Sequence, residues 1–322
     1  MSATMTEEPA AGTVVQRSPF ALTIRRFRRD RASLVALVFI GFLVIFAACA
    51  PLIETAMGHS PIEQYRDTGL SDMGLPVAPN VEFPLGTDHL GRDVLVRLAY
   101  GARVSLLVGV FASLAASLIG LVVGVVAGYV GGAIDMVLSR VMDLVMSVPF
   151  LLCALALVSV FGPSLELSVS VIVFFSWTTV GRVIRAEVSS LRRREFIEAS
   201  RSLGAGPLSI MIRDILPNLS VPILIYTTMM IPSSVVFEAT LSFLGLGIVP
   251  PTPSWGGMLA DAAGNSIYLV AWWLVIFPGT ALLLTTLAFN ILGDGLRDAL
   301  DPRSAPARIS RFKKKSRQAG RG

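Results

Sequence analysis

The feature that most constrains this chain is a series of long apolar runs without a charged side chain. Residues 34–53 and 104–130 contain no Asp, Glu, Lys or Arg. A helix of about 20 apolar residues is long enough to cross the roughly 30 Å hydrocarbon layer of a membrane. Apolar residues make up 53% of the chain and charged residues only 15%. These runs therefore predict an all-α integral membrane protein rather than a soluble domain.

Four more apolar runs follow, and we expect six transmembrane helices. Gly120, Gly124 and Gly128 recur at four-residue intervals in the second run, a spacing that lets another helix approach closely. Prolines inside several runs indicate a packed bundle, because neighbouring helices must satisfy the carbonyls that proline leaves unbonded. The predicted spans are 34–53, 104–130, 144–161, 165–184, 219–248 and 267–292.

The distribution of positive charge predicts the orientation of the chain. Of its 27 Lys and Arg residues, 23 lie in the segments 1–32, 131–147, 182–218 and 293–322. The other four lie in the loop 54–103, on the opposite side of the membrane. Because positive side chains concentrate in cytoplasmic loops, we expect both termini in the cytoplasm.

The predicted spans divide the chain into four parts. Residues 1–32 are a basic cytoplasmic segment, and residues 33–103 hold the first span and an outer loop. Residues 104–292 form a core of five spans with a cytoplasmic loop at 195–218. The basic tail 293–322 suits an anchor near anionic membrane lipid better than a nucleic-acid site, because it directly follows a span.

The loop 195–218, which we call the knob, is patterned like a docking element. The sequence places four residues at helical spacing on one face of a short predicted helix that Gly204 breaks: Phe196, Ile197, Ser200 and Leu203. A second amphipathic stretch, 208–216, ends before a proline. Two short helices joined by a glycine turn suit binding in a groove of a partner protein.

The knob also carries a known motif, in which Glu-Ala and a small residue precede a glycine and then a Leu-Pro pair. The residues that match it are Glu198, Ala199, Ser200, Gly204, Leu216 and Pro217. They resemble the EAA loop of the ABC-transporter permeases that work with binding proteins, with serine in place of a second alanine. Two further segments, 83–103 and 242–261, are similar to motifs of the C-type permease subunits in the dipeptide, oligopeptide and nickel branch.

This resemblance implies a fold and a function. It implies an ABC type I importer permease fold in the bacterial inner (cytoplasmic) membrane, with this subunit forming half of a pathway for short peptides. Nickel or a glutathione-type compound is the alternative cargo within the family. The chain has no Gly-x-x-x-x-Gly-Lys-[Ser/Thr] loop for a nucleotide. We therefore expect a transport subunit rather than an enzyme, with no cofactor of its own.

The resemblance also implies an assembly. A homologous permease completes a heterodimer, and two ABC ATPase subunits bind ATP and Mg²⁺. An extracytoplasmic substrate-binding protein is the remaining partner, and we expect no nucleic acid in the assembly. In it, Glu198 would pair with an ATPase arginine, Ala199 and Leu203 would pack against the ATPase, and Gly204 would permit the turn. The implied coupling residues are Glu198, Ala199, Ser200, Leu203, Gly204, Leu216 and Pro217.

Three residues of the fifth span, Glu238, Met229 and Met230, are candidates for the translocation pathway. A carboxylate inside a membrane is costly and suggests a functional role. An internal hydrogen bond from Glu238 to Ser242 or to a neighbouring span is an equal alternative. Methionine in a span is more often a packing residue than a pathway residue.

The outer side offers candidates for docking of the binding protein, some of them suited to ion pairs. They are Asp88, Arg92, Asp93, Trp255 and Asp261. His59 and His89 lie on the same side, without helical i,i+4 spacing or a carboxylate triad. We therefore interpret these two histidines as solvated loop residues and expect no metal site.

Two other classes of protein fit less well. A secondary transporter would show broken helices and membrane charges in matching halves, and Glu238 has no such counterpart. A membrane enzyme would need clustered catalytic groups, and the only two histidines lie in an outer loop. Cys49 and Cys153 lie inside apolar runs, so we interpret them as small buried hydrophobic residues.

Overall fold

The computed structural model describes residues 27–264 and 266–300, and within them every regular element is a helix apart from two isolated β-bridges. This confirms the predicted all-α fold. Most of the basic segment 1–32 and most of the tail 293–322 lie outside the described residues, and the predicted orientation stays a prediction. Five helical segments are long and apolar enough to cross a membrane: α2 (Arg31–Ala48), α4 (Val94–Val130), α7 (Leu165–Leu191), α9 with α10 (Pro207–Phe243) and α12 (Trp273–Leu300).

The third predicted span is a bent pair of helices instead of one helix. α5 (Gly132–Ser147) and α6 (Phe150–Phe161) meet at an angle of 79°, so the predicted bounds 144–161 are wrong. Val148 has an extended backbone because the ring of Pro149 disfavours a helical conformation in the residue before it. The count of six spans holds if this pair crosses the membrane as one unit.

A helix cap explains the largest of the differences at three other span ends. α4 begins ten residues before the predicted start at 104, because the Asp93 carboxylate accepts hydrogen bonds from the backbone N–H groups of Leu95 and Val96, at 2.7 and 3.2 Å. The first span ends at Ala48, and a separate helix, α3 (Ala50–Met57), follows it. α7 continues seven residues past the predicted end at 184.

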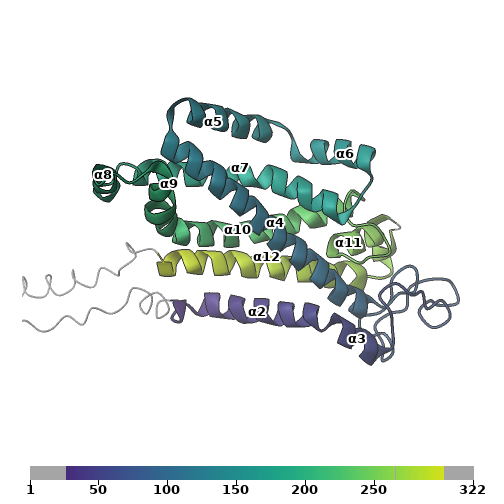
Figure 1. Ribbon diagram of the computed structural model, residues 1–322. Helices are drawn as coiled ribbons and strands as arrows, with labels where there is room; N and C mark the ends of the chain where they lie inside the picture. The colour runs from purple at the N-terminus through teal and green to yellow at the C-terminus, as the bar shows by residue number, and fades with distance from the viewer. Residues whose placement is uncertain (1–26, 265, 301–322) are drawn as a thin grey trace, which may run out of the picture.

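The end of the bundle that holds the outer loop also contains helical segments that the sequence did not predict. A short helix, α11 (Trp255–Gly264), precedes a 3₁₀ turn at Ile267–Leu269. The last span therefore begins at Trp273 and not at 267, and it continues to Leu300. In the ribbon, the knob lies at one end of the bundle, while α11 and the loop before α4 lie at the other (Figure 1).

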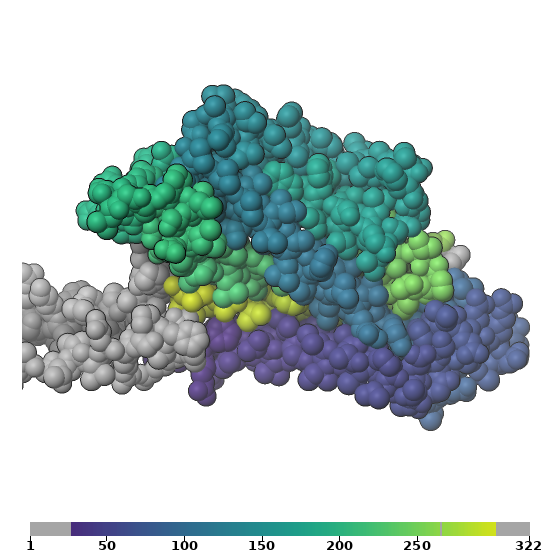
Figure 2. Space-filling model, viewed as in Figure 1, coloured from purple at the N-terminus to yellow at the C-terminus, as the bar shows by residue number. Residues whose placement is uncertain are grey.

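The centre of the bundle is the contact between α4 and α7, with α10 and α12 packed beyond α4. α2 lies along α12 at one edge of the bundle, and α5 and α6 lie at the opposite edge (Figure 1). The space-filling view shows the green knob projecting from the bundle at the end opposite the blue outer loop (Figure 2). The knob is thus an exposed part of the surface.

The predicted glycine stripe is the seam between α4 and α7. A Cβ atom on Gly120 would lie 2.7 Å from the carbonyl oxygen of Trp177, and one on Gly124 would lie 2.8 Å from that of Gly181. A Cβ atom on Gly128 would meet the next turn of α7 at 2.7 Å. No real Cβ atom tolerates such distances to backbone, so only glycine permits this helix contact.

We predict that Gly124→Leu lowers the midpoint of thermal unfolding of the detergent-solubilised protein, because the new side chain forces the α4 and α7 backbones apart. Overpacking of this kind costs about 1–3 kcal/mol. The matched control is Gly41→Leu in α2, where a Cβ atom meets nothing within 4 Å. An unchanged midpoint for Gly124→Leu would show that the seam is not tight.

Candidate functional site

The knob consists of two short helices and a wide helical turn. α8 (Glu195–Ser202) is followed by Gly204, whose φ of +83° suits glycine far better than any other residue. α9 (Pro207–Ile210) then leads into a π-helical turn at Met211–Ile215. The predicted arrangement of two helices around a glycine turn is therefore present.

The second helix does not end at Pro217 as the sequence suggested. The π-helical turn runs directly into α10 (Leu216–Phe243) without a break. Proline lacks an N–H group, and its ring collides with a carbonyl of the preceding helical turn. The wider π-helical turn lies directly before Leu216 and Pro217, in the place of the α-helical turn that the ring would crowd. The knob is thereby continuous with the fifth span.

One face of the knob is fixed to the bundle. Ile197, Ile210 and Ile215 are buried in a cluster with side chains of α4 and α7, including Tyr129 and Val188. These contacts remove the three isoleucine side chains from water, which stabilises the position of the knob on the bundle. A force on the knob is therefore transmitted to α4 and α7.

The opposite face of the knob carries exposed apolar side chains, so the prediction that Ile197 and Leu203 share a face is wrong. Leu203 is 88% exposed, and Phe196, Leu208 and Ile212 are also exposed. Clustered exposed apolar residues of this kind mark surfaces that bind other proteins. Sequence reasoning did not list Leu208 and Ile212 as contacts, although it identified their segment as amphipathic.

The structure places the predicted coupling residues mostly on the surface. Glu198, Ala199, Leu203 and Gly204 are exposed, whereas Ser200 is half-buried. Leu216 and Pro217 are exposed at the start of α10. Their role in contacts with an ATPase stays a prediction.

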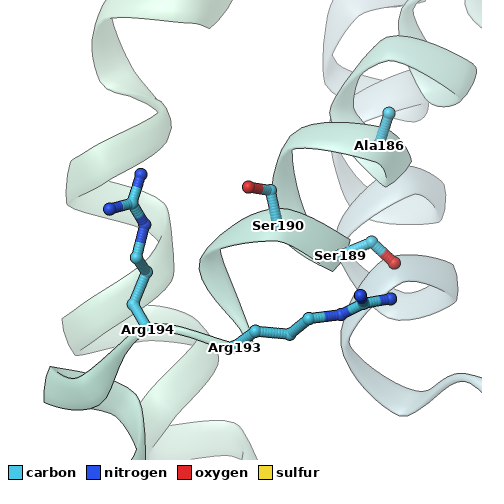
Figure 3. Close-up of a pocket in the computed structure, with 5 residues that line it drawn as sticks. All are labelled: Ala186, Ser189, Ser190, Arg193 and Arg194. Carbon is cyan, nitrogen blue, oxygen red and sulfur yellow. The ribbon is translucent and has the colours of Figure 1, made fainter.

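A polar pocket of about 450 Å³ lies beside the knob, at the end of α7. We call it the arginine cleft, and its lining residues are Ala186, Ser189, Ser190, Arg193 and Arg194. Figure 3 shows the two arginine side chains extended on different sides of the last turn of α7, with Ser190 directed toward the side of Arg194. Sequence reasoning missed this pocket, because three adjacent arginines after a span read only as a topology signal.

A neighbouring pocket of about 390 Å³ contains Glu198. It shares Ser189 and Arg193 with the arginine cleft and is also lined by Arg192 and Arg201. Glu198 thus lies among three arginines of its own chain. Arg192 donates to the carbonyl oxygen of residue 130 at 3.3 Å, and Arg201 lies 5.4 Å from the centre of the Tyr129 ring.

The three pathway candidates all lie against other parts of the chain. Glu238 is fully buried and accepts hydrogen bonds of 2.8 Å from Ser105 of α4 and from Ser242. This is the internal arrangement that the sequence offered as the alternative to a pathway role. Met230 lies 3.7 Å from the hydroxyl of Ser117, and Met229 packs against Gly293 of α12. Their assignment to the pathway remains a prediction without support from this geometry.

We predict that Glu238→Ala destabilises the protein, because the hydroxyl groups of Ser105 and Ser242 lose their buried acceptor. An unsatisfied buried polar group costs about 1–3 kcal/mol. Glu238→Gln keeps an acceptor oxygen and should lower the stability of the protein less. Glu166→Ala replaces an exposed side chain and should lower the stability hardly at all. Thermal unfolding in detergent measures all three, and equal midpoints for Glu238→Ala and Glu166→Ala would contradict the assignment.

The docking candidates of the outer side form a largely buried ionic cluster. Arg92 pairs with Asp88 at 2.6 Å and with Asp261 of α11 at 3.1 Å. Arg97 lies 3.3 Å from Asp88 and 3.8 Å from Asp261. The predicted ion pairs are therefore present, but they join the outer loop to α11 inside the chain.

Two more docking candidates are also turned inward. The Trp255 indole N–H donates to the carbonyl oxygen of Leu98 at 3.2 Å, and Asp93 caps α4. Among all five candidates, Asp261 alone is half-buried, and the other four are buried. A docking role for this side stays a prediction, and these contacts assign most of its residues to holding the outer loop in place.

His59 is not the solvated residue that the sequence suggested. It is buried, its Nδ1 atom lies 2.8 Å from the Asp93 carboxylate, and its ring stacks on Phe83 with centroids 4.6 Å apart. The reason is the cap of α4, whose buried carboxylate needs a further polar partner. Burial also raises the pKa of the neighbouring Tyr65 hydroxyl above its ordinary value.

His89 is the half-buried member of a group that has the geometry of a metal site. One ligand atom each from Asp88, His89 and Asp261 lies within 4.8 Å of the others. Both carboxylates already pair with Arg92 and Arg97, whose positive charges oppose the binding of a cation. The expectation of no metal site stays a prediction. Cys49 and Cys153 are free and half-buried.

An all-helical bundle of candidate membrane spans with a protruding helix-turn-helix knob has the architecture expected of a transport permease. Residues 120–306 match the family described as the binding-protein-dependent transport system inner membrane component. Residues 18–68 match the N-terminal transmembrane domain of oligopeptide transport permease C. The chain belongs to this family of multi-pass inner-membrane permeases, as the motif of the knob indicated.

Several characterised permeases are similar over nearly the whole chain. The dipeptide transport system permease protein DppC of Escherichia coli K12 is 42% identical over 299 residues, which are 93% of this chain and 98% of DppC. The oligopeptide transport system permease protein OppC of the same organism is 42% identical over 87% of this chain and 89% of its own length. The glutathione transport system permease protein GsiD of Escherichia coli O1:K1 is 38% identical over 89% of this chain and 91% of GsiD.

Proposed function

We propose that this chain is a permease subunit of an ATP-driven importer and forms half of a membrane pathway for short peptides. The observation that carries the proposal is 42% identity with both a dipeptide and an oligopeptide permease over most of each chain. A glutathione permease is slightly less similar, at 38%, and glutathione is itself a small peptide-like compound. It is the alternative cargo.

The partners in this proposal follow from the type of transporter. A second, homologous permease completes the pathway, two ATPase subunits bind ATP and Mg²⁺, and a substrate-binding protein delivers the cargo from outside. This chain contributes no cofactor site of its own and no chemical step. Its task is to change the access of the pathway when the ATPase subunits close and open.

The geometry of the knob supports such a coupling role. Its exposed face offers Leu203 and Phe196 to a partner, while its buried face is fixed to α4 and α7 through Ile197. The segment from Pro207 to Phe243 is helical throughout and, at 1.5 Å per residue, is about 55 Å long. A shift of the knob therefore moves the fifth span directly, without an intervening flexible loop.

We predict that Leu203→Asp abolishes or reduces peptide uptake at least about tenfold, because a charge in the apolar face opposes its burial against the ATPase. The spans should still insert, since this side chain packs against nothing in the bundle. The control is Val81→Asp, an equally exposed apolar residue of the outer loop. Uptake of a labelled dipeptide by cells that carry the complete transporter measures the effect, and wild-type uptake by Leu203→Asp would refute the coupling assignment.

The cargo class is tested with the same cells. We expect uptake of labelled di- and tripeptides that depends on this subunit and is competed by unlabelled peptides. Deletion of the subunit should remove that uptake, and the wild-type gene should restore it. If uptake of glutathione depends on this subunit and uptake of the peptides does not, glutathione is the cargo.

A further inference from the structure

We propose that the arginine cleft is a second docking point on this subunit and binds an acidic side chain of the partner ATPase. The proposal rests on the function proposed above and adds to it a specific electrostatic contact beside the apolar face of the knob. The groups available for the contact are the guanidinium groups of Arg193 and Arg194, which extend on different sides of the last turn of α7, each with a serine hydroxyl, from Ser189 or Ser190, on its side (Figure 3).

The first argument is that the two arginines have no internal counter-ion. Neither Arg193 nor Arg194 forms an ion pair with any residue in the described part of the chain, although both line the same pocket. The two arginines within α7 itself are paired with carboxylates of α5. Arg182 pairs with Asp143 at 2.7 Å, and Arg185 forms a bidentate ion pair with Asp135.

The second argument is the shape and chemistry of the cleft. A volume of about 450 Å³ is ample for a carboxylate side chain. A guanidinium group donates hydrogen bonds from a planar fork that matches a carboxylate, and serine hydroxyl groups can donate as well. The cleft therefore offers hydrogen-bond donors of both kinds, and none of its lining side chains is acidic.

The third argument concerns the surroundings of Glu198. Arg192, Arg193 and Arg201 line the same pocket as this carboxylate, so its charge is offset within the chain. From residue 192 to residue 218 the chain carries five arginines against three carboxylates, so the three arginines before the knob give this part of the surface a net positive charge. An acidic surface on the partner is its electrostatic complement, in addition to any arginine that contacts Glu198.

An anionic lipid is the less suitable occupant because of the position of the cleft along α7. Counting from Leu165, the first residue of α7, the roughly 20 residues of a span end near residue 184. Arg193 follows nine residues later, about 13 Å further along the chain at helical rise. The lipid headgroup layer is only about 5–8 Å thick on each side. The cleft is thus nearer to a protein docked on the knob than to lipid phosphate.

The test compares charge variants of the permease in the assembled transporter. We expect the double variant Arg193→Glu with Arg194→Glu to weaken association of the ATPase subunits at least about tenfold at 50 mM salt. Its association should also depend less on salt than that of the wild type, because fewer ionic contacts remain to be screened. The double lysine variant keeps the positive charge but loses the planar guanidinium groups. Its affinity for the ATPase subunits should lie between that of the wild type and that of the double glutamate variant.

The control is Arg140→Glu in α5, an exposed arginine outside the cleft, which should leave association unchanged. The complex is held in nanodiscs of neutral phosphatidylcholine, and dissociation of labelled ATPase subunits is followed at 50 and 300 mM salt. A double glutamate variant that binds like the wild type, with Leu203→Asp still defective, would overturn the arginine cleft but leave the proposed function standing. Wild-type binding by both variants would refute the coupling role itself.

Lipid is tested in the same experiment. If the charge reversal weakens association only in nanodiscs that contain anionic phosphatidylglycerol, the cleft binds lipid phosphate and the proposal is overturned. A defect of the same size in neutral and anionic nanodiscs supports a carboxylate of the ATPase as the occupant.

Discussion

The close contact of α4 with α7 is the constraint on which the rest of the structure depends. Three glycines let the two backbones touch, so the ends of both helices present one continuous apolar surface. Ile197, Ile210 and Ile215 of the knob are buried on that surface. If the helices were further apart, the three isoleucines would have no common cavity, and the knob would be a loose loop. The glycine stripe therefore determines the rigidity of the element that transmits force.

Continuity through Pro217 is the second structural requirement for coupling. A proline inside a helix removes one backbone hydrogen bond and crowds the preceding turn. The π-helical turn Met211–Ile215 takes the place of the α-helical turn that the ring would crowd, and the helix continues into α10. The partner of the knob thus acts on two structures at once, on α4 and α7 through side-chain packing and on α10 through the main chain. Neither connection requires a change in the fold of the subunit.

The sequence predicted the features that depend on local composition. Long apolar runs located five spans and the all-α fold, and the spacing from Glu198 to Pro217 located the knob and its glycine turn. It could not predict features that depend on contacts distant in the chain. The partner of His59 is Asp93, which lies 34 residues away. The helix α11 depends similarly on packing, since Trp255 is buried against Leu98 of α4. The arginine cleft is lined by neighbouring residues of the segment 186–194, but their composition alone does not distinguish a pocket from a topology signal.

The placement of charges distinguishes the two ends of the molecule. At the outer end, Asp88, Arg92, Arg97 and Asp261 neutralise one another inside the chain, so this end is held together before any partner arrives. The cytoplasmic end, as the sequence orients it, keeps arginines unpaired beside an exposed apolar face. Apolar contacts supply binding energy without direction, whereas guanidinium–carboxylate contacts fix orientation. A coupling element must be held in one register while its partner moves, and the combination of both contacts meets that requirement better than either does alone.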